Sequence, residues 1–376
     1  MPDPIFDELN LTTLKEIYPR VIEDNFFLDT PLLAYLRDHC RLPFGGGAFM
    51  QATFGFAPML GGFYSRGGNF NITKVQTLAG CVFEPKYIQV SVPEYKEDVQ
   101  VLNKGPLAVF SLIDTDLRFA MQTMNAQIAV AMARHGQAAG GAVVDNRPEV
   151  INGWAEAIND GITNSWDGNV FATYGTATRN AVVGSALNSI PKWCGDGLGN
   201  AGMITYNVME EAYQDACVGR QEPDLIVSNK AAHAYMKERL QVQQRFQQER
   251  DVIWGVTGFR FNNAMVLKDD YFPSLRYGQN DPLIGNWLTA AFTAAAGPAA
   301  TSDLPAGVVV NPTEVVTMYN TKKILLRVSN DPEYGFGFTG FKPAQDNTRV
   351  VGQILAGLNL EFTSCKLHKQ LYGIGS

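Results

Sequence analysis

Charged side chains are scarce in this sequence. Asp, Glu, Lys and Arg together make up 18% of its 376 residues, compared with about 25% in a typical soluble domain. Hydrophobic residues make up an ordinary 46%, and glycine is frequent, with 36 residues. Few charges and much glycine fit a loop-rich enzyme, and they also fit a subunit whose surface is covered in an assembly. Composition alone favours neither class, and the length allows one large core or two or three smaller ones.

An excess of basic residues is also absent. Lys and Arg number 30 against 37 Asp and Glu, so the formal net charge is −7. A dedicated nucleic-acid-binding protein would show a basic domain or stripe, which argues against that class. The balance does not exclude an inner surface with a few local positive charges.

Cysteine is rare, and no pair of cysteines has the spacing of a zinc site. The five cysteines are widely scattered: Cys40, Cys81, Cys194, Cys217 and Cys365. An odd number without a secretion signal predicts reduced thiols and synthesis in a cytoplasm. The acidic start MPDPIFDELNL lacks the basic residues and apolar run of a signal peptide. No apolar run reaches the roughly 18 residues of a membrane span, so we expect no membrane contact.

Catalytic motifs are missing as well. The sequence contains no GxSxG, HExxH, Walker or dinucleotide-binding pattern, and the triple glycine at Gly45 is not followed by GK[ST]. The four histidines, His39, His135, His233 and His368, are isolated from one another in the sequence. Tryptophan- and glycine-rich loops could line a carbohydrate site, but no carboxylate pair stands beside them. We therefore predict a protein without catalytic residues, cofactor or metal.

A glycine- and aromatic-rich segment extends from Gly45 to about Cys81. Glycine weakens an isolated hairpin and aromatic side chains favour burial, so this segment is expected to lie against another surface. A long exposed apolar hairpin would aggregate unless a partner covered it. The residues expected at this contact between subunits are Phe54, Phe56, Gly61, Gly62, Phe63, Tyr64, Arg66, Phe70 and Lys74.

A strand and a long helix follow this segment. Ile88, Val90 and Val92 alternate with polar neighbours, which predicts a half-buried strand from Lys86 to Val92. Apolar residues at three- and four-residue steps predict a helix from Pro106 to His135, about 45 Å long at 1.5 Å per residue. Its core stripe consists of Phe110, Ile113, Leu117, Met121, Met124 and Ile128.

Further strands and helices predict an α+β fold. A buried strand at Pro223–Val227 precedes a helix for which Ser228 is the expected N-cap. Shorter strands are expected at 258–261, 264–267, 315–319 and 324–328. A strand of about 13 residues, roughly 40 Å, should run from Val350 to Phe362, with its apolar face formed by every second residue. Packing of this strand on the long helix would form an elongated platform.

Several stretches in this order resemble the tailed-bacteriophage major capsid proteins, which have the Hong Kong 97-type capsid fold. They are FEPKYIQVSVPEYKEDVQVLNKGPLAVFSLIDTDLRFAMQTM, then PDLIVSNKAAHAYMKERLQVQQRF with GFRFNNAMVLKDDYFP, and finally TEVVTMYNTKKILLRVSNDPEYGF with RVVGQILAGLNLEFTSCKLHKQLYGI. FATYGTATRN and Trp193 look like a further family feature. The likeness covers nearly the whole chain, although no single short motif is diagnostic.

The resemblance implies a division of the chain into five parts. They are an N-terminal arm (1–46), an extended hairpin (47–82), a peripheral domain with a spine helix (83–145), a central axial domain with loop insertions (146–338) and a return to the peripheral domain (339–376). It also implies shell hexamers and pentamers, in which each hairpin lies over a neighbouring subunit. The implied function is that of the major capsid protein of an icosahedral head, assembled in the bacterial host cytoplasm.

The resemblance implies partners too: a portal protein, packaged double-stranded DNA and in some cases a decoration protein. The arm begins almost at Met1, so we expect a separate scaffolding protein and no cleaved scaffolding segment. Arg245, Arg250, Lys366 and Lys369 could face DNA without sequence specificity, and a solvated helix face with a polar tail explains them equally well.

Some family members join a hairpin lysine to an asparagine of another subunit. Lys74 would be the lysine here, and Asn347 or Asn359 the acceptor, but both residue types are common and the sequence does not favour a crosslink. Three alternatives remain: a shell protein of an encapsulin-type nanocompartment, which shares the fold, a minor virion component such as a decoration or tail protein, and an enzyme with an unrecognised site.

Overall fold

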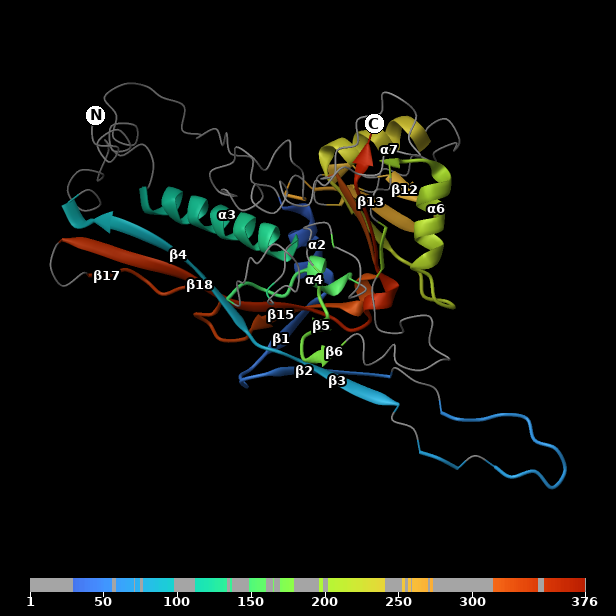
Figure 1. Ribbon diagram of the computed structural model, residues 1–376. Coiled ribbons are helices and arrows are strands. Elements are labelled where there is room, and N and C mark those ends of the chain that lie inside the picture. The colour runs from blue at the N-terminus through green and yellow to red at the C-terminus, as the bar shows by residue number, and fades with distance from the viewer. Residues whose placement is uncertain are drawn as a thin grey trace.

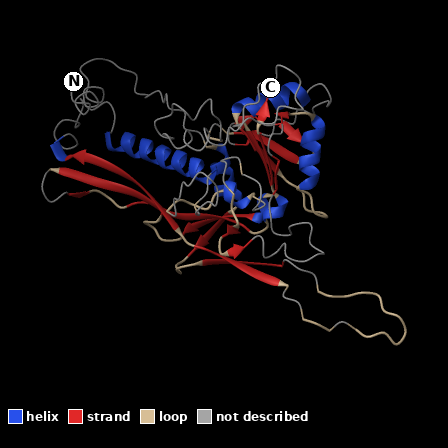
Figure 2. Ribbon diagram, viewed as in Figure 1, coloured by secondary structure: helices blue, strands red, loops and turns tan. Residues whose placement is uncertain are grey.

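Two six-stranded sheets form the body of the molecule in a computed structural model of the chain (Figures 1 and 2). The structure describes residues 30–55, 59–70, 72–74, 77–97, 112–133, 136, 149–159, 165, 170–178, 196–198, 202–240, 252–253, 256–257, 259–269, 271–272, 314–343 and 348–375. No helix within these ranges is long and apolar enough to cross a membrane.

The first sheet contains the strands of the elongated part. In order, β1, β15, β18 and β16 are neighbours, and β4 and β17 also pair with β18. The strands are β1 (Arg41–Phe44), β4 (Lys86–Tyr95), β15 (Ile324–Ser329), β16 (Gly335–Phe338), β17 (Lys342–Pro343) and β18 (Arg349–Phe362). β18 runs antiparallel to β4 along the full length of β4, from Arg349 opposite Tyr95 to Leu358 opposite Lys86.

The second sheet has the order β12-β13-β9-β14-β19-β7. Its strands are β7 (Asp196–Leu198), β9 (Leu225–Ser228), β12 (Phe259–Phe261), β13 (Ala264–Lys268), β14 (Val315–Tyr319) and β19 (Lys369–Tyr372). Four two-stranded pairs complete the strands: β2 (Met50–Gly55) with β3 (Leu78–Phe83), β5 (Thr173–Tyr174) with β6 (Ala177–Thr178), β8 (Gly202–Met203) with β20 (Ile374–Gly375), and β10 (Val252–Ile253) with β11 (Val256–Thr257).

Helices lie on both sheets. They are α2 (Pro31–His39), α3 (Leu112–Ala133), α4 (Trp154–Ala157), α6 (Tyr206–Asp215) and α7 (Lys230–Leu240). α3 lies along β4 and β18 on one face of the first sheet, and α6 and α7 flank the second sheet (Figure 1). The predicted packing of the long helix on the long strand is therefore confirmed.

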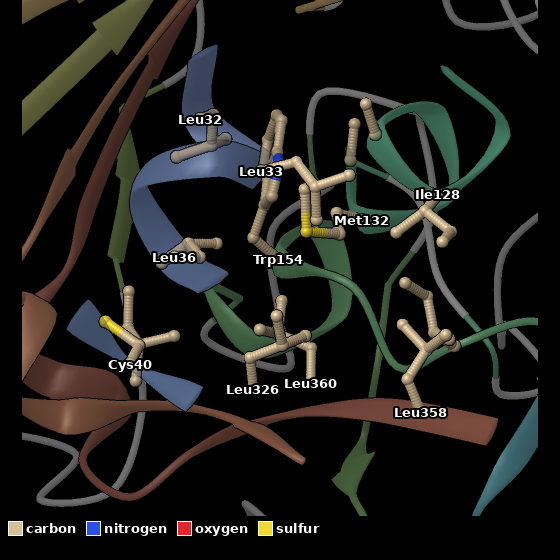
Figure 3. Packing of buried hydrophobic residues seen from close by; sticks show 14 of the residues in the cluster. Leu32, Leu33, Leu36, Cys40, Ile128, Met132, Trp154, Leu326, Leu358 and Leu360 are labelled. Atoms are coloured by element: carbon tan, nitrogen blue, oxygen red, sulfur yellow. The ribbon is translucent and has the colours of Figure 1, made fainter. Parts of the chain in front are cut away.

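The core explains why these elements meet. Met124, Ile128 and Met132 of α3 are buried against alternate residues of β18, including Leu358 and Leu360. Figure 3 shows the same core continuing to α2, where Leu32, Leu33 and Leu36 face Trp154 and the first sheet. A second cluster, built on Ile226, Val266 and Met318, packs α6 and α7 on the other face of the second sheet.

Two crossings of the chain join the sheets. One runs from β14 to β15 through the 3₁₀ turn Thr321–Lys323, and the other from β18 to β19 through the 3₁₀ turn Cys365–Leu367. The crossings are bonded to each other, because the Asn320 amide donates to His368 Nδ1 (3.2 Å) and the Thr363 amide donates to the Lys323 carbonyl (2.9 Å). The sheets are thus tied side by side at these crossings.

Strand pairing places three segments of the predicted division. Residues 31–44, predicted as part of the arm, contain α2 and β1, and β1 pairs in parallel with β15. The return to the first sheet begins at β15, within the range assigned to the axial domain. β19, assigned to the returning segment, joins the second sheet. Strand pairing over long sequence separations decides all three, and no local pattern encodes it.

One predicted helix cap is also corrected. The N-terminus of α7 is capped by the side chain of Asn229, whose Oδ1 accepts from the Ala232 amide at 2.8 Å. Ser228, the expected cap, is the last residue of β9 and is buried. The strand extends one residue further than predicted, which moves the cap to the next residue.

Candidate assembly surface

A hairpin projects from the body beyond both sheets. β2 and β3 pair antiparallel from Met50 opposite Phe83 to Gly55 opposite Leu78. The connecting segment extends far from the rest of the molecule, at the lower right of Figure 1. We call its described residues, 59–70 and 72–74, the projecting loop. The extended hairpin predicted at 47–82 is present.

Large apolar side chains cover the projecting loop without being buried. Phe63 is fully exposed, and the exposed fractions of Met59 and Ile72 are 81% and 91%. Tyr64 and Phe70 contact each other edge to face, with ring centroids 4.8 Å apart, yet both remain exposed. Burial of a side chain of this size contributes about 1.5–3 kcal/mol. A partner that covered the loop would gain that contribution several times.

The loop is also positively charged. Arg66 and Lys74 are exposed, and no acidic residue occurs between Gly55 and Leu78. Gly61 and Gly62 have open space where a side chain would project, so they leave the backbone accessible to a partner. The predicted contact residues Gly61, Gly62, Phe63, Tyr64, Arg66, Phe70 and Lys74 therefore share this surface. Phe54 lies in β2, and Phe56 lies outside the described residues.

The base of the hairpin, in contrast, is buried in the body. Cys81 and Phe83 of β3 are buried, and the Cys81 thiol donates to the Ala52 carbonyl at 3.8 Å. Burial, and then the charge of Glu361, raise the pKa of the Cys81 thiol to about 12, so it stays protonated. The hairpin is thus anchored at one end and exposed at the other.

A hydrogen-bond network lies beside this base. Asn359 of β18 is buried; its side-chain amide donates to the Glu84 carbonyl (2.7 Å) and to Asn152 Oδ1 (2.9 Å). Its Oδ1 accepts from the Asn152 amide at 2.9 Å. Asn152 in turn donates to the buried carboxylate of Glu156 at 3.0 Å. An amide engaged in this way is not accessible to a lysine of another subunit, which argues against Asn359 as a crosslink acceptor; Asn347 lies outside the described residues.

An open groove with a volume of about 1160 Å³ lies on the first sheet. Its walls are the triple glycine, β4 and the loop after β15, with Tyr87 and Tyr334 in edge-to-face contact at 5.7 Å. Asp331 also lines the groove, and its Oδ1 accepts from the Glu333 amide at 2.9 Å. The described part of the chain contains no cluster of His, Cys, Asp and Glu that could hold a metal ion.

No family model matches the sequence, and no curated protein matches it either. Solved structures do. A chain of the cyanophage A-1(L) capsid asymmetric unit has a TM-score of 0.63 at 13% identity, covering 96% of this chain and 97% of that chain. The head structure of Helicobacter pylori bacteriophage KHP40 has a TM-score of 0.51 at 10% identity, covering 96% and 95%. The SrpI encapsulin of Synechococcus elongatus has a TM-score of 0.54 at 8% identity, covering 100% and 96%.

The chain has the Hong Kong 97-type capsid fold. In the terms of this fold, the first sheet with α3 is the peripheral domain, and the second sheet with α6 and α7 is the axial domain. The projecting hairpin leaves the body at the base of the peripheral domain (Figure 1).

The spine helix of this capsid fold is α3, described from Leu112 to Ala133. Its predicted core residues are graded in burial. Met124 and Ile128 are fully buried, whereas Ile113, Leu117 and Met121 are partly exposed. Phe110 lies outside the described residues. The helix is thus most deeply packed where it crosses the centre of the molecule.

One of the four residues expected to face DNA is buried inside the molecule. Lys369 is buried in β19, and its Nζ lies 3.1 Å from Asp215 Oδ2 of α6. It is therefore wrong as a DNA-facing charge: its ammonium is engaged inside the axial domain. Lys366 is partly exposed, and Arg245 and Arg250 lie outside the described residues.

Proposed function

We propose that this chain is a major capsid protein, a structural subunit that self-assembles into an icosahedral head and performs no reaction of its own. The projecting loop is the single observation that carries the proposal. Its apolar side chains find no cover on their own subunit, so a second copy of the chain is the surface that buries them. The capsid fold supports the same conclusion, because its solved examples are phage capsids and heads and an encapsulin.

The proposal extends to the partners of such a head. We propose a portal protein, a separate scaffolding protein, packaged double-stranded DNA and in some heads a decoration protein, with assembly in the bacterial host cytoplasm. DNA contact would be non-specific, through scattered positive charges such as Lys366, since the formal net charge of the chain is −7.

An encapsulin-type compartment is the second candidate, because the encapsulin likeness covers 100% of this chain. Both functions use the same contacts between subunits, so the shell alone does not separate them. The contents do. A phage head packages double-stranded DNA through a portal, whereas an encapsulin encloses a cargo protein. Genes for a portal and a terminase beside this one favour the head.

Electron microscopy of the overexpressed, purified chain tests the proposal directly. We expect closed shells or capsomer-sized rings in negative stain, and fast-sedimenting species by ultracentrifugation. Ultraviolet absorbance and mass spectrometry of the particles would then identify nucleic acid or cargo. A stable monomer at all concentrations, with the projecting loop protected from proteolysis by its own subunit, would contradict the proposal.

Removal of the loop tests its part in assembly. Deletion of Gly55–Gly68 should leave a folded subunit, because the described residues of the deleted stretch add no side chain to either hydrophobic core. The same subunit should fail to form closed shells. A Gly-Ser segment of equal length in place of the loop is the matched control, since it restores chain length without apolar side chains and should fail in the same way. Intact shells from both variants would show that contacts between subunits do not require the loop.

A further inference from the structure

The outer edge of β3 is held by a short turn from a distant part of the chain. β5 and β6, residues Thr173–Thr178, form this turn and are called the clamp below. The Val82 amide of β3 points away from β2 and donates to Thr176 Oγ1 at 3.2 Å. An open strand edge presents unpaired amides, and the clamp satisfies one of them at this position.

The clamp approaches β3 too closely for a side chain at its central residue. Gly175 has a φ of +57°, in the region that favours glycine. A Cβ atom at this residue would lie 2.9 Å from the Val82 carbonyl oxygen, 3.1 Å from Cys81 Cβ and 3.1 Å from the ring of Phe83. The backbone therefore contacts three successive residues of β3, and glycine is required there.

Tyr174 connects the clamp to the peripheral sheet. Its buried ring meets the Phe83 ring edge to face, with centroids 5.0 Å apart. Its hydroxyl accepts from the Phe362 amide at the end of β18, at 2.9 Å. Burial raises the pKa of Tyr174 well above its ordinary value, so the phenol stays neutral in this position. Tyr174 thus couples the hairpin base to the end of the long strand.

These contacts end where the hairpin leaves the body. The clamp contacts residues 81–83 of β3, whereas Leu78 and the projecting loop beyond it are exposed. The direction of a two-stranded hairpin that emerges into solvent is set at its last fixed point, since an isolated hairpin is marginally stable by itself. Within the described residues, this last fixed point is the contact between β3 and the clamp.

We propose that the clamp sets the direction in which the projecting hairpin leaves the subunit, with Tyr174, Gly175 and Thr176 as positioning residues. Resting on the proposed function, the consequence is that the clamp also determines where the loop meets the next copy and hence whether the shell closes.

Distance measurements on the unassembled, full-length subunit test the first half. Spin labels carried on noncanonical residues at Ser65, in the loop, and Lys322, in the body, are both at exposed positions. The wild type should give one narrow distance distribution. Thr176→Val removes the hydrogen-bond acceptor and Gly175→Ala introduces the clash, so both should broaden or shift it. Thr176→Ser keeps the hydroxyl and should restore the narrow distribution.

Hydrogen exchange gives a local readout at Val82 itself. The Val82 amide should exchange about five- to tenfold faster in Thr176→Val, the change expected for one lost hydrogen bond. Its rate should be unchanged in Thr176→Ser, and the melting temperature of Thr176→Val should fall by no more than about 4 °C, which shows that the body of the subunit stays folded. An unchanged Val82 rate in Thr176→Val, or a wild-type distance distribution as broad as that of the variants, would overturn the proposal.

Assembly of the same variants tests the second half. Thr176→Val subunits should form open or irregular particles, and Thr176→Ser subunits closed shells. Wild-type-like shells from a Thr176→Val subunit with a displaced loop would show that loop direction does not govern closure. If the wild type itself forms no shells, the proposed function fails, while the distance and exchange measurements still decide whether the clamp holds the hairpin.

Discussion

At the scale of single residues, buried polar groups mark where the two domains meet. His368 lies in the crossing from β18 to β19, and its ring is 4.9 Å from Phe362 and 6.1 Å from Tyr319 by ring centroids. Its Nδ1 accepts from the Asn320 amide of the other crossing at 3.2 Å, a role that requires a neutral ring. The four histidines are isolated from one another in the sequence, and this one is a buried residue that joins the two crossings.

Acid should weaken the subunit through this histidine. Burial lowers the pKa of His368 from its ordinary 6.5 to about 3, and burial with Lys237 and Lys268 lowers that of His233 to about 4. Between pH 6.5 and the lowered pKa of each histidine, the unfolded chain therefore binds more protons than the folded one. The stability contributed by neutral His368 is therefore present above pH 6.5 and is lost as the pH falls towards 3, at about 1.4 kcal/mol per pH unit.

Urea denaturation of the unassembled subunit between pH 7 and pH 4 measures this loss. His368→Asn keeps an acceptor near Nδ1 but does not titrate in this range, so its stability should fall less steeply with acid. Carboxylates contribute equally to both proteins and cancel in the comparison. Equal slopes for the two proteins would contradict the prediction.

At the scale of elements, the spine helix buries its large apolar side chains, whereas the projecting loop exposes similar ones. Met124 of α3 is fully buried against the first sheet, whereas Met59 of the loop is 81% exposed. A buried side chain contributes to the stability of its own subunit, and an exposed one contributes only after a partner covers it. Sequence composition does not distinguish the two methionines.

Truncation of each methionine should separate folding from assembly. Met124→Ala should lower the free energy of unfolding of the subunit by about 2–5 kcal/mol, because it leaves a cavity under α3. Met59→Ala should leave that free energy unchanged within about 0.5 kcal/mol. Chemical denaturation of the unassembled subunits measures both. A comparable loss of stability in Met59→Ala would mean that the loop packs on its own subunit.

At the scale of the whole molecule, the subunit is built around two domains and one extension that it does not bury. The two crossings and α2 fix the domains to each other; the Asp269 carboxylate of the axial domain accepts from the Leu32 amide of α2 at 3.1 Å. The hairpin leaves this body with its apolar loop exposed (Figure 1). Under the proposed function, the next copy of the chain buries this loop.

Replacement of the loop's apolar surface should therefore keep the subunit and remove the shell. The combined change of Phe63, Tyr64, Phe70 and Ile72 to Ser should raise the solubility of the subunit and leave its melting temperature unchanged. Closed particles should be absent by electron microscopy and sedimentation. Phe63→Leu with Phe70→Leu is the matched control, since it keeps apolar area and should still assemble. Shells from the serine variant would show that apolar burial by the loop does not drive assembly.

Much of the secondary structure could be predicted because it follows from local periodicity. The alternation of Ile88, Val90 and Val92 with exposed polar neighbours is present in β4, and the strand from Val350 differs from β18 by one residue at its start. The hairpin could be predicted from its glycine and aromatic residues, because glycine weakens an isolated strand pair and aromatic side chains favour burial. These signals lie within a few residues of one another, so the chain carries them wherever it folds.

Pairing, burial and anchoring could not be predicted, because they depend on residues far apart in sequence. Arg41 pairs with Leu326, the Val82 amide donates to Thr176, and Asn359 donates to Glu84. Lysine is usually a surface residue, yet Lys369 lies buried beside Asp215. The amino-acid sequence by itself determined which segments form strands, the spine helix and an uncovered apolar loop. Only the tertiary structure decided which strands share a sheet and what holds the hairpin, since the energy of those contacts exists only once both partners are brought together.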